Sequence, residues 1–336
     1  PTCHWRDTNA AVDTWLVVVE SAPPAARMCF VSERPDWTPA PADWEEIKRR
    51  SADQPVALAV QGFRSASPRQ ILTGARVRLR TSRDPVGAPI FYREVNLPFL
   101  EAVKDPSRIR WRFGAIDSLQ PPRVVLEKLP VCGNCHSFSQ DGKVLGMDVD
   151  YANDKGSYVI TSVAKEMALA ASDIISWGDF RREDGQQTYG FLSQVSPDGQ
   201  RVVSTVKDKS VFVARPNLAF SQLFFPLQGI LTVYDRNRRT FQALPGADDP
   251  AYVQSNPVWS PDGRHIVFAR APAYQLRAAH GEGRVLFTPE ECAEFTQERK
   301  PFPYDLYRVP YNDGRGGTPE PLPGASHNGR SNYFPR

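Results

Sequence analysis

The sequence lacks several features that would each point to a particular class of protein. No apolar run is long enough to cross a bilayer, so we expect no transmembrane span. No basic tract stands out and the net charge is only +3, which argues against a nucleic-acid partner. The chain opens PTCHWRDTN, with neither a methionine nor an apolar leader. We therefore expect that a signal peptide has been removed, or that the sequence begins inside a longer protein.

Cysteine is also scarce, and only one C-x-x-C pair occurs among the five cysteines. A structural zinc site often needs a second such pair, and a thioredoxin-type dithiol needs a βαβ context that this sequence does not show. Cys3 and Cys29 could form a disulfide if the protein is exported, and two unbridged thiols fit the sequence equally well. Cys292, in TPEECAEF, is expected to be a small packed side chain on a short helix.

Proline is abundant, with 31 residues, which favours a β-rich chain with many loops because proline breaks helix interiors. Residues 1–100 contain short runs with β-branched residues or period-2 alternation, such as TWLVVVES and ARVRLRTSRD. Residues 43–50, DWEEIKRR, predict a short helix with acidic residues early and basic residues late. These patterns predict an N-terminal domain resembling an immunoglobulin or fibronectin sandwich.

A repeat begins after a connector of residues 101–136, in which RIRWRFGAI and RVVLEKL predict two further strands. The motif S-x-D-G, each time followed by an alternating strand, contains Asp141, Asp198 and Asp262. Asp-Gly favours a tight turn because glycine adopts positive φ without strain. Spacings of 57 and 64 residues are compatible with four-stranded propeller blades. Trp177 and Trp259 are expected to be aromatic residues of the blade cores.

This repeat resembles the β-propeller of TolB-type and related WD40-like proteins, whose blades carry S-P-D-G followed by an apolar strand. The resemblance covers roughly residues 137–336, and WSPDGRHIVFA is its clearest copy. Near the end of the chain, Ser331-Asn332 parallels Ser255-Asn256, which precedes the third turn. The parallel predicts that the sequence ends inside the first strand of a fourth blade. Only about three blades are visible, whereas propellers close with about four to eight. We therefore expect the natural protein to continue beyond this sequence.

Cys132, Cys135 and His136 form the pattern C-x-x-C-H directly before the first blade. Two thiols at this spacing reach two vinyl groups on one porphyrin edge, and the next histidine can reach the iron. The pattern predicts one covalent haem c, held by Cys132 and Cys135 with His136 as the proximal iron ligand. Zinc, a redox dithiol and a chance match are the alternatives. Because haem c is attached after export, the motif also predicts an extracytoplasmic location.

The distal iron ligand is harder to assign. Met147 is the leading candidate, because His/Met ligation is common and raises the potential. It alternates with Leu145 and Val149, however, which favours core packing. The hairpin at Asp141-Gly142 would also place Met147 almost opposite Cys135, too close to enclose a porphyrin unless a bulge or a wider loop intervenes. Four other histidines, on strands or loops, are weaker candidates: His4, His265, His280 and His327. The clustered carboxylates in DVDYANDKG are Asp148, Asp150 and Asp154. Such a cluster can bind calcium, but the spacing is not that of an EF-hand loop, so we interpret it as a solvated hairpin turn.

A second resemblance covers the C-x-x-C-H motif, the propeller repeat and the preceding β domain together. The sequence is similar to a group of exported bacterial proteins with C-x-N-C-H-S-F-S-x-D-G at the start of a TolB-like propeller. In that group the motif follows a β-sandwich that contains D-P-V-G-A-P-I-F-Y-R; the two segments are residues 132–142 and 84–93 here. The resemblance implies a c-type cytochrome and export, and it implies no particular reaction.

The predicted fold is therefore all-β: a sandwich-like domain, then propeller blades that carry a C-x-x-C-H haem c site. The predicted function is extracytoplasmic electron transfer, with the propeller as a docking scaffold for redox partner proteins, such as other subunits of an electron-transfer complex. One alternative is a TolB-like binding scaffold without a redox role. Another is a haem-dependent oxidoreductase, for which no Ser/His/Asp set or carboxylate pair is visible.

Overall fold

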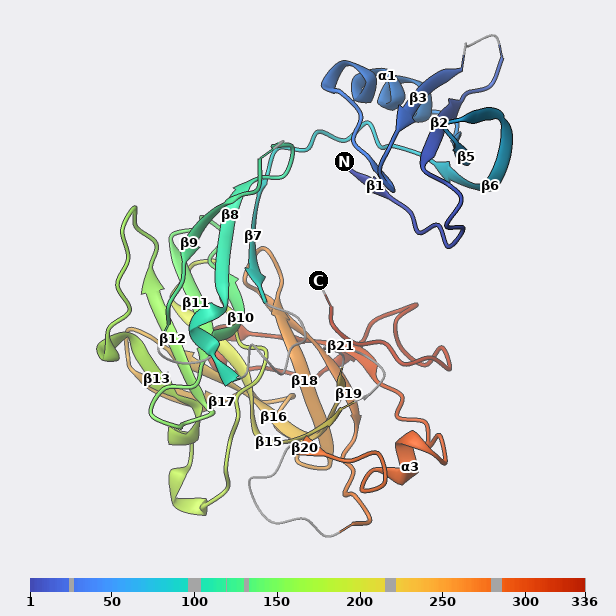
Figure 1. Cartoon of the computed structure of the whole chain (residues 1–336). Coiled ribbons are helices and arrows are strands. Elements are labelled where there is room, and N and C mark those ends of the chain that lie inside the picture. The colour runs from blue at the N-terminus through green and yellow to red at the C-terminus, as the bar shows by residue number, and fades with distance from the viewer. Residues whose placement is uncertain are drawn as a thin grey trace. The chain divides into compact units, whose positions relative to one another are not determined.

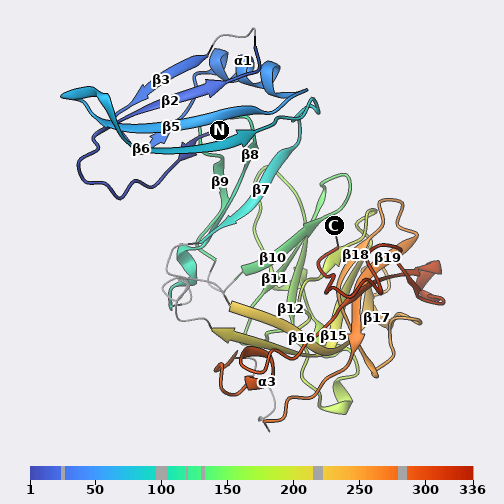
Figure 2. The same ribbon diagram turned by 90° about the vertical axis from the view of Figure 1, so that its right-hand side faces the viewer.

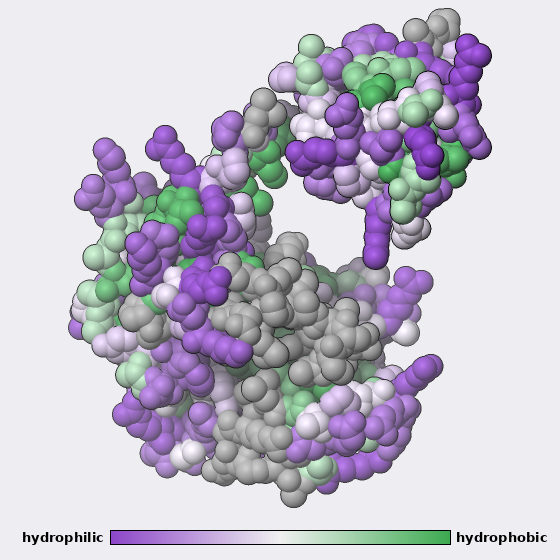
Figure 3. Space-filling model, in the orientation of Figure 1, coloured by the Kyte–Doolittle hydropathy of each residue, from purple (hydrophilic) through white to green (hydrophobic). Residues whose placement is uncertain are grey.

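The structure is a computed structural model that describes residues 1–23, 27–95, 104–118, 120–129, 133–214, 222–278 and 286–335. The chain divides into two compact units, Pro1–Gly87 and Ala88–Arg336. The sheets of each unit are built from its own strands (Figure 1). Among the residues that carry a hydropathy colour in Figure 3, hydrophilic side chains predominate, with smaller apolar patches between them. Among the described residues, no helix is long and apolar enough to cross a membrane.

The first unit consists of a four-stranded antiparallel sheet, a separate two-stranded ladder and a helix, rather than two stacked sheets of a sandwich. The sheet has the order β3-β2-β5-β6, and β1 pairs separately with β4. The strands are β1 (Cys3–His4), β2 (Thr14–Glu20), β3 (Met28–Ser32), β4 (Asp36–Trp37), β5 (Val56–Arg64) and β6 (Ser67–Leu79). The helix α1 (Pro41–Ser51) begins with a proline and ends with three basic residues, as its sequence predicts.

The sandwich prediction for this unit differs from the observed arrangement, and α1 is the physical reason. Ile47 of α1 is fully buried and packs in one apolar cluster with Val17 and Val19 of β2. The helix therefore covers the face of the sheet that a second sheet would cover in a sandwich. The predicted strands themselves are present, so only their layering was predicted incorrectly.

A three-stranded sheet opens the second unit, in the order β7-β8-β9 (Figure 2). Its strands are β7 (Pro89–Glu94), β8 (Arg110–Ala115) and β9 (Arg123–Leu126). The two strands predicted in the connector are β8 and β9. β7 falls inside the range expected for the N-terminal domain, but it pairs along its whole length with β8. Trp111 of β8 is fully buried and reaches the core of the first blade.

Three four-stranded antiparallel meanders follow, and each has the strand order of a propeller blade. The second and third are joined into one nine-stranded sheet by a parallel pair between Gly229 and Val253. The first is β10 (Gly133–Phe138), β11 (Val144–Val149), β12 (Ser157–Ser162) and β13 (Ile174–Ser176). The second is β14 (Gln194–Val195), β15 (Arg201–Ala214), β16 (Gln222–Asp235) and β17 (Thr240–Ala243). The third is β18 (Tyr252–Trp259), β19 (His265–Pro272), β21 (Asp305–Pro310) and β22 (Glu320–Pro321). β20 (Leu286–Phe287) pairs with β15, and the short helix α3 (Ala293–Thr296) lies before β21.

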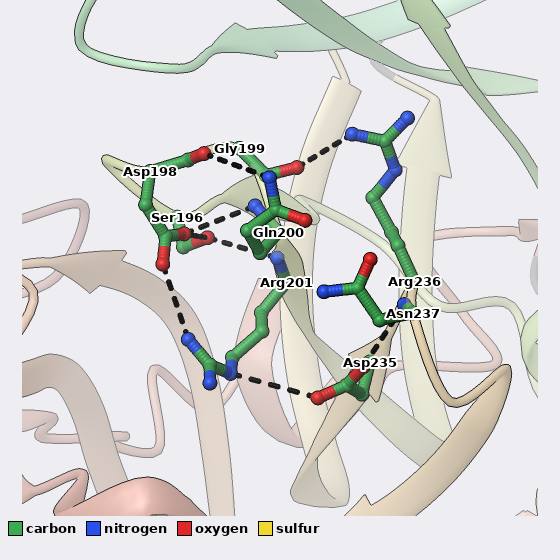
Figure 4. A network of polar contacts seen from close by, with 8 residues as sticks. All are labelled: Ser196, Asp198, Gly199, Gln200, Arg201, Asp235, Arg236 and Asn237. Atoms are coloured by element: carbon green, nitrogen blue, oxygen red, sulfur yellow. Dashed lines mark hydrogen bonds and ion pairs between the residues drawn. The ribbon is translucent and has the colours of Figure 1, made fainter.

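Each blade contains its S-x-D-G motif as the turn between the first and second strands. In the second blade, the Ser196 hydroxyl donates to Asp198 Oδ1 at 2.5 Å and accepts from the Arg201 N–H at 2.9 Å. Gly199 has φ +70°, which explains the glycine at this turn. Arg201 then links the turn to the third strand by ion pairs with Asp198 and Asp235 (Figure 4). The predicted repeat and its turn chemistry are confirmed.

The first strands of the blades are joined side by side by polar contacts at equivalent repeat positions. The Val195 N–H of β14 donates to the Ser137 hydroxyl of β10 at 2.9 Å. The Trp259 indole N–H of β18 donates to the Gln194 carbonyl of β14 at 3.1 Å. Trp177 is fully buried and Trp259 nearly so, as predicted for blade-core aromatic residues. Residues 327–335 contain no strand, so a first strand of a fourth blade is not formed there.

Candidate functional site

The C-x-x-C-H motif lies where the chain enters the first blade. Cys132 falls outside the described residues, whereas Cys135 and His136 belong to β10. β10 pairs with β11, and the register shifts between Gly133 and His136. A β-bulge of this kind redirects side chains locally and often occurs next to functional sites. The motif is thus part of the first strand of a blade, and not of a separate helical domain.

The two residues between the cysteines are held by the preceding sheet. The Arg93 guanidinium of β7 donates to the Gly133 carbonyl at 3.0 Å and to Asn134 Oδ1 at 2.7 Å. A Cβ atom on Gly133 would lie 2.6 Å from Cη2 of Trp111, so only glycine fits here. Arg93 was not singled out from the sequence. It lies in the segment DPVGAPIFYR that carried the second resemblance, which is the signal that could have identified it.

His136 is partly buried between two aromatic rings. Its ring centroid lies 4.7 Å from that of Phe91 and 6.3 Å from that of Phe138, both in edge-on geometry. Burial lowers the pKa of His136, and the nearby Arg93 charge acts in the same direction, against hydrogen bonds to the backbone of Phe91 and Asn134. The imidazole is therefore neutral at pH 7. Neutral imidazole is the form that coordinates a metal ion.

Met147, the predicted distal ligand, is directly opposite His136 in the β10–β11 pair. It is fully buried in an apolar cluster with Ile109, Trp111 and Val159. Directly paired residues have Cα atoms about 4.5–5.5 Å apart, which leaves no room for a porphyrin between them. This geometry favours the core-packing interpretation of Met147, and we do not retain it as a ligand.

The other predicted histidines are not brought to the motif by any contact that the structure describes. His4 is on β1 of the first unit, and His265 is on β19 of the third blade. His327 Nδ1 lies 3.2 Å from Asp305 Oδ2, and the His327 N–H donates to Asp305 Oδ1 at 2.9 Å. His280 lies outside the described residues.

The remaining cysteines have structural positions. Cys3 packs in the apolar cluster of the first unit, whereas Cys29 is exposed, and neither forms a disulfide. Cys29 alternates along β3 with Met28 and Phe30, which pack against that cluster, so its thiol lies on the face of β3 away from the cluster that contains Cys3. Cys292 is fully buried in an apolar cluster directly before α3, as the sequence predicts.

The predicted carboxylate turn is only partly correct. Asp150 pairs with Lys155, and Asp154 accepts from the Gly156 N–H at 2.9 Å, as expected for a hairpin turn. Asp148 instead lies in β11, and its Oδ2 is buried without a hydrogen-bond partner. Within the part of the chain that is described, no group of three or more His, Cys, Asp and Glu side chains is arranged to hold a metal ion.

Comparisons with known proteins give weak likenesses. No protein-family model matches the chain, and no curated protein matches it either. The chain is similar to TolB from Acinetobacter baumannii, with 12% identity, a TM-score of 0.38, and coverage of 81% of this chain and 55% of that one. It is similar to a prolyl endopeptidase, with 14% identity, a TM-score of 0.35, and coverage of 65% and 26%.

An oligogalacturonate lyase from Vibrio parahaemolyticus is also similar, with 14% identity, a TM-score of 0.33, and coverage of 70% of this chain and 49% of the lyase. The chain thus spans about half or less of the length of these three proteins. At these TM-scores the likenesses carry no argument. The description of the chain as all-β, with three blade-like meanders, rests on its own sheet topology.

Proposed function

We propose that the chain is an extracytoplasmic docking scaffold made of propeller blades, and that it carries one haem c for electron transfer. Cys132 and Cys135 would bind the haem covalently, and His136 would be the proximal iron ligand. The observation that carries this proposal is the position of C-x-x-C-H, whose histidine is partly buried between Phe91 and Phe138 at a bulge of the first blade strand.

The described part of the motif fits such a group. Cys135 is partly exposed, so its thiol can be reached by a porphyrin edge. The neutral His136 imidazole is held edge-on by Phe91, which fixes the plane of the ring before iron binds. The contacts from Arg93 to Gly133 and Asn134 hold the segment between the two cysteines. When bound, the haem supplies a one-electron redox centre, and the blades supply the surface on which a redox partner docks.

A binding scaffold without a redox role is the second candidate. The blade topology and the contacts between the first strands do not depend on the motif, and propeller folds serve many functions. In this case Cys135 and His136 would be structural residues. The two candidates share the docking role and differ in whether haem is attached.

Variants expressed with the export and haem-attachment machinery separate the candidates. Cys135→Ser and His136→Ala should each lower the yield of haem-bearing protein, because a thioether bond or the proximal ligand is lost. Cys29→Ser is the matched control, since Cys29 is an exposed thiol far along the sequence from the motif. The control should attach haem as the wild type does. Equal haem content in all four proteins, or none in any, would contradict the haem proposal and leave the scaffold.

A further inference from the structure

β6 is the last strand of the four-stranded sheet in the first unit, and its outer edge pairs with no other strand of the described chain (Figure 2). It has 13 residues, and residues 74–78 are all exposed. Residues 73–79 pair with residues 62–56 of β5 without a register shift. The free edge along this stretch therefore presents a regular row of backbone N–H and C=O groups, which is the arrangement that an added strand requires.

The two faces of this edge differ in chemistry. Val77 pairs with Leu58, which packs in the cluster beneath α1, so Val77 lies on the α1 side of the sheet. The side chain is nevertheless 58% exposed, because it stands at the border of the sheet. Arg76 and Arg78 flank Val77 in the sequence, so they point to the opposite face, and both are exposed. A strand added along β6 would meet positive charge on one face and an apolar side chain on the other.

The charge of β6 selects the kind of strand that fits. β6 contains three arginines and no acidic residue. Two copies of β6 paired with each other would bring arginines together, and like charges on paired strands destabilise a sheet. A strand with acidic side chains at alternate positions is complementary instead. Arg76 already pairs with the carboxylate of Glu20 on β2 at 2.8 Å, so this face of β6 accepts carboxylates.

Gly74 is a separate indication that another backbone approaches this edge. A Cβ atom on Gly74 would have one atom within 4 Å, the Val60 carbonyl oxygen at 3.7 Å, which is an ordinary contact. The packing of the first unit therefore does not require glycine here, although glycine weakens the interior of a strand. Glycine in a strand often marks a position where a ligand or a further backbone comes close.

We propose that β6 binds an extended segment of a partner protein by strand addition, and that acidic and apolar side chains alternate in this segment. The backbone of the segment pairs with residues 73–79. Its acidic side chains lie beside Arg76 and Arg78, and its apolar side chains lie beside Val77. The site belongs to the first unit, so it depends neither on haem attachment nor on the blades.

Peptide binding to the full chain tests the site. We expect a labelled peptide of four Glu-Val repeats to bind in fluorescence anisotropy, and the bound peptide to slow amide hydrogen exchange in residues 73–79 but not in β3. A peptide of four Glu-Pro repeats has the same charge, but proline has no N–H and cannot join a ladder. It should not bind measurably, and neither should a peptide of four Lys-Val repeats. These measurements use the unaltered protein.

Variants locate the site. Arg78→Glu should weaken binding of the Glu-Val peptide by about tenfold or more, because it places a like charge beside the acidic side chains. Arg34→Glu is the matched control, since Arg34 is an exposed arginine of the same unit that follows β3, the strand at the opposite edge of the sheet. This variant should bind the peptide as the wild type does.

Four results would overturn the proposal. The wild type could fail to bind the Glu-Val peptide, or it could bind the Glu-Pro peptide equally well, which would show attraction by charge alone. Arg34→Glu could lose as much binding as Arg78→Glu. Finally, the protein could form a concentration-dependent dimer that slows exchange in β6 without any peptide, which would make a second copy of the chain the occupant of this edge.

Discussion

At the scale of single residues, the register of β10 against β11 decides what Met147 can do. The sequence leaves two interpretations open, because Leu145, Met147 and Val149 alternate as core residues do, while Met147 also lies near the motif. The pairing of Met147 with His136 favours the core, since paired side chains cannot enclose a porphyrin. The turn sets the register of this hairpin, so the sequence already placed Met147 almost opposite Cys135. The β-bulge between Gly133 and His136, which the sequence did not show, makes His136 the actual partner.

Replacing Met147 with leucine should therefore change little. The swap keeps the side-chain volume and should cost less than about 1.5 kcal/mol in the free energy of unfolding. Met147→Ala should cost about 2–5 kcal/mol, because it leaves a cavity in a fully buried cluster. Urea unfolding measures both costs. If the protein carries haem, Met147→Leu should leave the haem absorption spectrum unaltered, and a changed spectrum would show that Met147 is an iron ligand.

Gly190 is a second residue whose role depends on its surroundings. It has φ +65°, and a Cβ atom would lie 2.2 Å from Cδ1 of Trp177. Gly142 has a similar φ of +70° with nothing within 4 Å, so it is the matched control. Gly142→Ala should cost about 1–2 kcal/mol for the backbone alone. Gly190→Ala should cost about 1–3 kcal/mol more, because its Cβ also overpacks the blade core. If urea unfolding gave the same loss in the free energy of unfolding for Gly142→Ala and Gly190→Ala, the close contact between Gly190 and Trp177 would be refuted.

At the scale of elements, local chemistry made the S-x-D-G turns predictable from the sequence. A serine, an aspartate and a glycine within four residues are sufficient to build each turn, without help from distant contacts. The helix α1 was predicted for the same reason. The layering of the first unit was not, because strand patterns do not show whether a helix or a second sheet covers them.

The S-x-D-G turns should also make the free energy of unfolding depend on pH in the acid range. The Ser139 hydroxyl, followed by the Lys143 N–H, lowers the pKa of Asp141 to about 2, and the pKa values of Asp198 and Asp262 are lowered too. A carboxyl with a lowered folded-state pKa stabilises the fold above its unfolded pKa of about 4. That contribution is lost as the pH falls toward about 2.

Urea unfolding between pH 5 and pH 2, a range set by these pKa values, measures this response. The Asp141→Asn variant should lose less stability than the wild type over this range, since asparagine does not titrate. NMR titration of the wild type should show low pKa values for all three turn aspartates. Ordinary values near 4 at these positions would contradict the turn geometry.

At the scale of the whole molecule, the chain consists of two units whose sheets do not share strands. Residues 80–88, between β6 and β7, contain no helix or strand, and nothing lies within 4 Å of a Cβ placed on Gly87. Limited trypsin digestion should therefore cut first within this segment, which contains Arg80 and Arg83. Two stable fragments, identified by mass, should remain. First cleavage inside the blades would contradict the division into units.

The second unit combines a blade scaffold with a motif that no general property of propellers explains. The number of blades visible in the sequence and their turns agree with the structure, while the haem rests on the motif and on the environment of His136. Electron transfer to a docked partner follows only if haem is present. The presence of haem is therefore the central claim to test.

The most direct test is a denatured mass together with a reduced pyridine haemochrome spectrum, on protein exported in a host with haem-attachment machinery. The account predicts a c-type spectrum and a mass increased by one haem, with the label on the peptide that contains Cys132 and Cys135. An unmodified mass without a Soret band would contradict the account. The chain would then be a blade-built binding scaffold in which Cys135 and His136 have structural roles.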